Sequence, residues 1–78
     1  MQLKKIMTPE VERLPKDTSI CDVAQKMKAL DVGMIPVYDG DRLVGMVTDR
    51  DITLRVVAEE RDAASTPAHA VMTPEVIY

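Results

Sequence analysis

The stretch that decides the fold is residues 34–47, which read MIPVYDGDRLVGMV. Two short apolar runs flank Asp39-Gly40-Asp41, which has the residue types of a hairpin turn. Pro36 has no N–H to donate to a neighbouring strand, so the first run predicts an edge strand or a kinked strand. The second run, residues 43–47, is apolar on both faces, which is typical of a strand buried between layers. Together the two runs predict a β-hairpin.

A helix is expected on each side of this hairpin. Thr18 or Ser19 can cap the first helix, and Gly33 follows where a left-handed C-terminal cap would lie. The inward stripe of this helix recurs at helical spacing, as Ile20, Val23, Ala24, Met27 and Leu30. The second helix is predicted over about residues 49–60. Its inward residues are expected to be Ile52, Val56 and Val57.

An extended stretch, bracketed by Pro9 and Pro15, precedes the first helix. The expected order is therefore strand, helix, strand, strand, helix. Such an order predicts the α+β class, with the helices on one face of a small sheet.

One five-residue word occurs twice, as Met7-Thr8-Pro9-Glu10-Val11 and as Met72-Thr73-Pro74-Glu75-Val76. The offset is close to the size of a small domain. We therefore expect residues 1–66 to form one unit and residues 67–78 to begin a second copy. The chain is expected to be a piece of a longer tandem protein, and the alternative is that single units assemble between chains.

Composition narrows the class of function. The chain has 78 residues, a net charge of −3 and one cysteine, Cys21. Acidic and basic residues are interspersed, which disfavours a nucleic-acid binder. A lone cysteine, without a signal peptide or a long apolar run, predicts a cytoplasmic protein that does not bind a membrane. So small an aliphatic core is marginally stable, and docking on a second copy would stabilise it.

Four segments of the sequence occur in an order that is typical of one known family. They are Ile6-Met7-Thr8-Pro9, the helix that ends near Gly33, residues 35–39, and Gly45-Met46-Val47-Thr48-Asp49-Arg50-Asp51-Ile52. Together, over roughly residues 4–60, they resemble the CBS (cystathionine β-synthase) domain. The resemblance implies a β-α-β-β-α unit that pairs with a second unit through its sheet.

The resemblance also implies a function. Paired CBS units usually bind an adenosine-containing ligand, such as AMP, ADP, ATP or S-adenosylmethionine, in clefts between the units. They regulate an attached domain or a partner protein and are not usually catalytic. No obligatory cofactor is implied. The expected assembly is a homodimer or a pair with a second CBS unit.

The candidate ligand site is Gly45-x-x-Thr48-x-x-Asp51, which runs from a strand into a helix. Backbone N–H groups at a helix start attract anions. The Thr48 hydroxyl suits a phosphate oxygen or a ribose hydroxyl, and Asp51 can accept hydrogen bonds from two vicinal ribose hydroxyls. The alternative is a plain helix cap, because Thr-x-x-Asp is close to a capping box. Gly45 allows either close packing in the hairpin or the approach of a ribose.

Adenine needs an apolar slot, which could come from Ile6, Met7, Val32, Met34, Ile35 and Pro36. By resemblance, Thr8 and Ile35 lie near the adenine. The alternative for these residues is ordinary core. Arg50, beside the Thr48 and Asp51 pair, would offset phosphate charge, although a lone helical Arg is more often just solvated.

Two functions other than ligand sensing remain. The chain could be a ligand-free dimerisation or association module, with its apolar residues serving only pairing. An enzyme is the least favoured alternative, because Cys21 and His69 suggest no nucleophile–base pair. The leading hypothesis is a regulatory adenine-nucleotide sensor.

Overall fold

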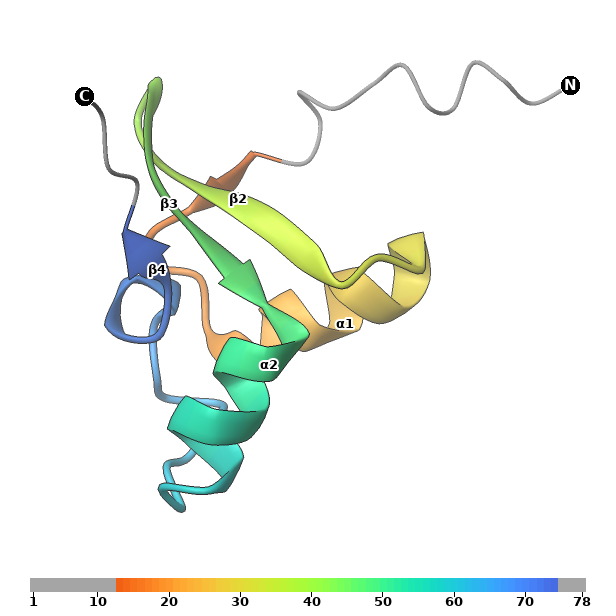
Figure 1. Ribbon diagram of the computed structural model, residues 1–78. Helices are drawn as coiled ribbons and strands as arrows, with labels where there is room; N and C mark the ends of the chain where they lie inside the picture. Colours follow the sequence, from red (N-terminus) through yellow and green to blue (C-terminus); the bar gives the residue numbers. More distant parts are fainter. Residues whose placement is uncertain (1–12, 75–78) are drawn as a thin grey trace, which may run out of the picture.

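A four-stranded sheet, covered on one face by helices, makes up the computed structural model, which describes residues 13–74 (Figure 1). The elements are β1 (Leu14–Pro15), α1 (Ile20–Leu30), β2 (Met34–Asp39), β3 (Arg42–Thr48), α2 (Asp49–Ile52), the π-helical turn η3 (Thr53–Val57), the 3-10 turn η4 (Ala68–Ala70) and β4 (Thr73–Pro74). The predicted α+β class and the β-α-β-β-α order are confirmed. Of the predicted opening stretch, the part before residue 13 lies outside the described residues.

The sheet has the order β1-β2-β3-β4, with β1 parallel to β2 and the other neighbours antiparallel. Gly40, at φ 66°, makes the turn of the predicted hairpin. Here β2 is flanked on both sides where it pairs with β1, so the edge-strand alternative is wrong for residues 37–38. Pro36 lies before that pairing begins, and the register of β2 shifts just after it, between Val37 and Tyr38.

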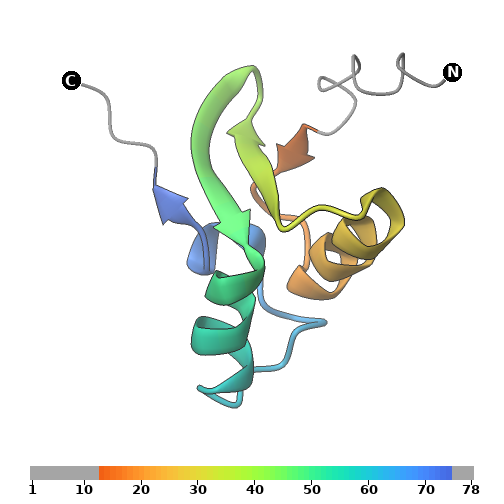
Figure 2. The ribbon, with the colours of Figure 1, turned by 45° about the vertical axis from the view of Figure 1, so that its right-hand side comes forward.

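The core lies between the sheet and the helices. Figures 1 and 2 show α1 and α2 on the same side of the sheet. Side chains of β2 alternate between core and outside, as a strand with one covered face should. The buried apolar residues are Leu14, Ile20, Val23, Met27, Ile35, Val37, Val47, Val56, Ala68 and Val71.

Each end of α1 is set by a single residue. The Asp22 N–H donates to Ser19 Oγ at 3.1 Å, which confirms Ser19 as the N-cap. The left-handed C-cap is Asp31, at φ 58°, and not Gly33 as predicted. Aspartate tolerates this conformation better than most residues, so the helix can end before the glycine. Gly33 instead lies against the start of α2, where its carbonyl accepts the Asp49 N–H at 2.9 Å.

The predicted inward stripes are too wide. On α1 only Ile20, Val23 and Met27 are buried, whereas Ala24 is exposed and Leu30 is 39% exposed. The short sheet therefore covers only the middle of the apolar stripe on α1 and leaves its margins, at Ala24 and Leu30, exposed.

The second helix departs from its predicted course. It is α-helical only to Ile52, after which the Ala58 N–H donates to the Thr53 carbonyl, a π-type hydrogen bond. The wider turn shifts the phase of the following side chains. Val56 stays buried, but Val57 is 66% exposed, so its predicted inward position is wrong.

The segment after η3 returns to the sheet. The Ile20 N–H donates to the Thr66 carbonyl at 2.8 Å, and Ala68 and Val71 are fully buried. A short 3-10 turn, η4, ends at Ala70 just before β4. Then β4 pairs with β3, Thr73 opposite Met46. Residues 67–74 thus complete this core, while the assignment of residues 67–78 to a second unit stays a prediction.

Candidate functional site

The junction of β3 and α2 is held by a capping box. Thr48, the N-cap of α2, accepts the Asp51 N–H on its Oγ1 at 3.0 Å. In return, the Thr48 N–H donates to Asp51 Oδ2 at 3.0 Å. Each side chain therefore satisfies a backbone donor that the first helical turn leaves without a partner. The cap interpretation of Thr48 and Asp51 is confirmed.

Asp51 has further partners beyond the cap. The residue is only 7% exposed. The Thr73 hydroxyl donates to its carboxylate at 3.3 Å from Oδ1 and 3.4 Å from Oδ2, and Arg55 Nε lies 3.9 Å from Oδ1. A carboxylate so nearly buried must be paired to keep its charge. Its partners here all come from the same unit.

Arg55 connects residues 71–72 to the helical segment that follows the capping box. From η3, its Nη1 donates to the Val71 carbonyl at 3.1 Å and to the Met72 carbonyl at 3.3 Å. Its side chain remains about half exposed, at 51%. Arg55 and Thr73 therefore hold residues 71–74, which we call the closing segment, against the capping box.

Gly45 is required by the closing segment. A Cβ at Gly45 would lie 2.7 Å from Met72 Sδ and 2.7 Å from the Thr73 carbonyl oxygen. The sulfur could swing away, but the backbone oxygen could not move without shifting β4. Close packing is therefore the reason for Gly45 that its surroundings require, but the packing is against the closing segment and not within the hairpin as predicted.

The face of the sheet opposite the helices carries apolar side chains beside Thr48. Paired residues lie on the same face, and the register pairs Met34 with Thr48, Pro36 with Met46, and Met46 with Thr73. Met34 is 53% exposed, and nearby Val32 is 42% exposed. We call Met34, Pro36, Met46 and Thr48 the open face. It places methionine and proline side chains beside Thr48, whose hydroxyl and N–H are bonded to Asp51.

The remaining predicted site residues are distributed differently. Ile35 is 1% exposed and points into the core, as the ordinary-core alternative predicts. Arg50 is exposed in the first turn of α2. Ile6 and Thr8 lie outside the described residues.

Two residues near Asp51 were missed or undervalued at the level of sequence. Thr73 was not considered as a contact, although the repeated Met-Thr-Pro word marks it. Arg55 is four residues after Asp51, a spacing at which helical side chains meet. Neither spacing nor repetition alone predicts that the two converge on one carboxylate.

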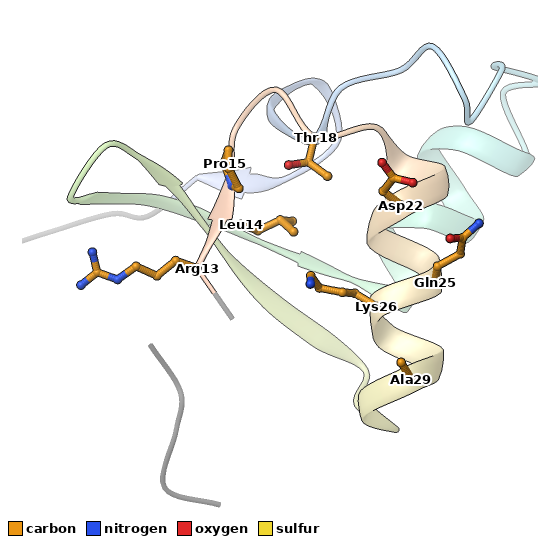
Figure 3. Close-up of a pocket in the computed structure, with 8 residues that line it drawn as sticks. All are labelled: Arg13, Leu14, Pro15, Thr18, Asp22, Gln25, Lys26 and Ala29. Atoms are coloured by element: carbon orange, nitrogen blue, oxygen red, sulfur yellow. The ribbon is translucent and has the colours of Figure 1, made fainter. Parts of the chain in front are cut away.

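A separate groove lies between β1 and α1 (Figure 3). It has a volume of about 580 Å³. One of its charged residues is already engaged, because the Arg13 guanidinium lies 4.7 Å above the Tyr38 ring and 3.4 Å from Asp41. The groove shares no residue with the capping box or the open face. Its lining is Arg13, Leu14, Pro15, Thr18, Asp22, Gln25, Lys26 and Ala29.

The family follows from comparison with known proteins. Residues 3–58 match the family model of the CBS domain. This chain belongs to the CBS domain family. Among curated CBS relatives, it is 41% identical over 75 residues to the CBS domain-containing protein YhcV of Bacillus subtilis, covering 96% of this chain and 53% of that protein.

Solved CBS structures share the fold. A putative signal-transduction protein with CBS domains from Burkholderia ambifaria aligns with a TM-score of 0.79 and 33% identity, over 85% of this chain and 48% of that one. A CBS domain protein from Pyrobaculum aerophilum complexed with AMP aligns at 0.71 and 30% identity, over 85% and 51% of the two chains. The present CBS chain thus spans about half the length of each of these three relatives.

Between residues 13 and 74, no helix has the length and apolar character needed to cross a membrane. Within the same range, histidine, cysteine and acidic side chains form no group that could hold a metal ion.

Proposed function

We propose that this CBS chain is a regulatory unit that binds an adenosine-containing ligand across its open face. The observation that carries the proposal is the pairing of Thr48 and Asp51 at a strand-to-helix junction, directly beside exposed apolar side chains. A site of this kind offers apolar contact for a base and a few convergent polar groups for a sugar. The AMP complex of the Pyrobaculum relative, at 30% identity, supports the ligand class.

Each group has a distinct role in the proposal. Asp51 accepts hydrogen bonds from the vicinal hydroxyls of the ribose, because an ionised carboxylate offers about four acceptor positions. The Thr48 hydroxyl contacts the ribose or the phosphate. Met34 and Pro36 pack against the adenine. Arg50, exposed on the first turn of α2, offsets the charge of a phosphate.

A second CBS unit completes the site in this proposal. The open face is a surface on one unit, and a cleft that buries most of a nucleotide needs a second wall. Exposed Met34 and Val32 provide apolar area for such a docking. The second occurrence of the Met-Thr-Pro word and relatives of about twice the length support a second unit, whether in a longer chain or in another copy. The pair would act in the cytoplasm, on an attached domain or a partner protein.

The competing function is a ligand-free association module. One observation favours it, because Asp51 already has partners from its own unit and needs no ligand to satisfy its charge. In that case the open face would serve pairing alone, and nucleotide would leave the stability of the protein unchanged. We expect no catalysis, since among residues 13–74 the Cys21 thiol meets only Gln25, at 3.8 Å, and no base.

Titration calorimetry with AMP tests the proposal. We expect a dissociation constant of about 10 μM, equivalent to roughly 7 kcal/mol. Loss of the carboxylate in Asp51→Asn should weaken binding about 10-fold to 100-fold, the effect of removing a charged hydrogen-bond acceptor. The matched control is Asp49→Asn, which removes the exposed neighbouring acid outside the capping box. It should change affinity less than about 2-fold.

A second ligand isolates the ribose contact. 2′-Deoxy-AMP keeps the base and the phosphate but has only one of the two vicinal hydroxyls. It should bind the wild type more weakly than AMP, and Asp51→Asn should discriminate less between the two. If AMP, ATP and S-adenosylmethionine all give no heat and no rise in the unfolding temperature, the ligand proposal is wrong and the association module remains. A ligand at about 100 times its dissociation constant should add about 2.7 kcal/mol of stability.

A further inference from the structure

The carboxylate proposed to bind ribose is covered in this structure by the chain itself. Asp51 is 7% exposed, and the two groups beside it that do not belong to the cap are the Thr73 hydroxyl and the Arg55 guanidinium. A ribose with two vicinal hydroxyls needs two acceptor positions on one carboxylate. Of the roughly four acceptor positions on the Asp51 carboxylate, the Thr48 N–H takes one on Oδ2 and the divided Thr73 hydroxyl takes one on each oxygen. Too few positions therefore remain for both ribose hydroxyls while Thr73 stays in place.

The two kinds of contact at Asp51 differ in quality. The capping bond from the Thr48 N–H is 3.0 Å long and lies within one turn of helix. The Thr73 hydroxyl instead divides itself between Oδ1 at 3.3 Å and Oδ2 at 3.4 Å. Hydroxyl donors usually lie closer, at about 2.7–2.8 Å from their acceptor. Thr73 is therefore the partner that an incoming hydroxyl can displace, with the cap left intact.

Displacement of Thr73 concerns more than one side chain. Thr73 belongs to the closing segment, which joins the sheet through short β4 alone. Arg55 supports the same segment through the Val71 and Met72 carbonyls. Val71 is anchored in the core, so removal of the Thr73 hydroxyl from Asp51 weakens the seating of the outer part of the segment, beyond Val71.

We propose that Thr73 is a built-in competitor for the ribose, so that ligand binding at Asp51 and seating of the closing segment oppose each other. The inference rests on the proposed function and specifies its regulation. Arg55 is the positioning residue that keeps the segment seated when Asp51 carries no ligand. By linkage, a ligand that loosens the segment binds more tightly when the segment is already loose. Occupancy of the site is thereby coupled to how firmly the closing segment is seated.

The test is Thr73→Val, which removes the hydroxyl but keeps a β-branched side chain suited to a strand. In calorimetry with AMP, the variant should bind about 3-fold to 10-fold more tightly than the wild type, the value of one lost competing hydrogen bond. The control is Thr53→Val, whose exposed hydroxyl donates to the Asp49 carbonyl and not to Asp51. Its affinity should stay within about 2-fold of the wild type.

Hydrogen exchange gives an independent readout. Saturating AMP should speed exchange in the closing segment of the wild type, whereas ordinary ligand binding slows it. Equal or weaker AMP binding by Thr73→Val, or slowed exchange in the closing segment, would overturn this inference alone, with the proposed function still standing. Absence of AMP binding in the wild type and in Thr73→Val would overturn both.

Discussion

Two helices of this unit begin with the same local chemistry and different surroundings. Ser19 and Asp22 open α1, and Thr48 and Asp51 open α2, each with a hydroxyl cap and an acid three residues later. At α1 the Asp22 N–H donates to Ser19, while among the described residues the Asp22 carboxylate accepts no hydrogen bond. At α2 the cap is reciprocal, and the acid also receives Thr73 from a distant segment. The same four-residue pattern therefore makes a surface cap in one place and a tertiary cross-link in the other.

The largest expected loss of stability comes from removing Asp51, and the variant to compare it with lacks Asp22. Asp51→Ala should lower the free energy of unfolding by about 2–3 kcal/mol, because it leaves the Thr48 N–H and the Thr73 hydroxyl without their acceptor. Asp22→Ala should cost less than about 0.5 kcal/mol, since it removes only a favourable charge at an exposed helix start. Urea unfolding of both variants measures the difference. Equal losses would mean that Asp51 stabilises the unit only through its charge at the start of a helix, as Asp22 does.

A smaller loss of stability is expected when the capping box of α2 is kept and β4, which carries Thr73, is displaced. Gly45→Ala places a methyl group 2.7 Å from the Thr73 carbonyl oxygen, so β4 must shift. We expect a loss of about 2 kcal/mol, typical of overpacking at a close contact. Circular dichroism should show that helix content is unchanged, because the capping box lies outside the clash. A variant as stable as the wild type would indicate that the closing segment contributes little.

A still smaller effect than that of Gly45→Ala should come from Arg55→Gln, which loosens the closing segment and removes the charge beside Asp51 but keeps the hydrogen bonds of the cap. Its hydrogen bonds to two carbonyls are about half exposed, so we expect a loss of about 0.5–1 kcal/mol. The control is Arg50→Gln, an exposed arginine on the same helical stretch. Thermal unfolding of the two variants gives the comparison. If Arg50→Gln costs as much, general charge on the helix, and not the link to the closing segment, is what stabilises the unit.

The features that the sequence predicted correctly are those that depend on residues close together in the chain. The hairpin, the Ser19 cap and the capping interpretation of Thr48 and Asp51 each depend on residues a few positions apart. Gly33 was wrongly predicted as a cap because Asp31, two residues earlier, can also adopt the left-handed conformation. The π-type turn after Ile52 has no simple pattern, and it moved Val57 outward.

The contacts that surround the candidate site were the least predictable. Thr73 is 22 residues from Asp51, and only the fold brings the two together. Ile35 and Pro36 are neighbours in one strand, so they face opposite sides, and only Pro36 lies on the open face. Periodicity shows that alternate residues share a face, but not which face the helices cover.

The burial of Ala68 and Val71 has a consequence for how the chain folds during synthesis. These residues follow the two helices, yet they fill the same core, and the closing segment adds the last strand of the sheet. A growing chain leaves the ribosome at about 5–20 residues per second, N-terminus first. The first helices and the hairpin must therefore wait for residues 68–74, which include the start of the second word, before their core and sheet can close. The segment that would begin a second copy is therefore also the last segment that the first unit needs in order to fold.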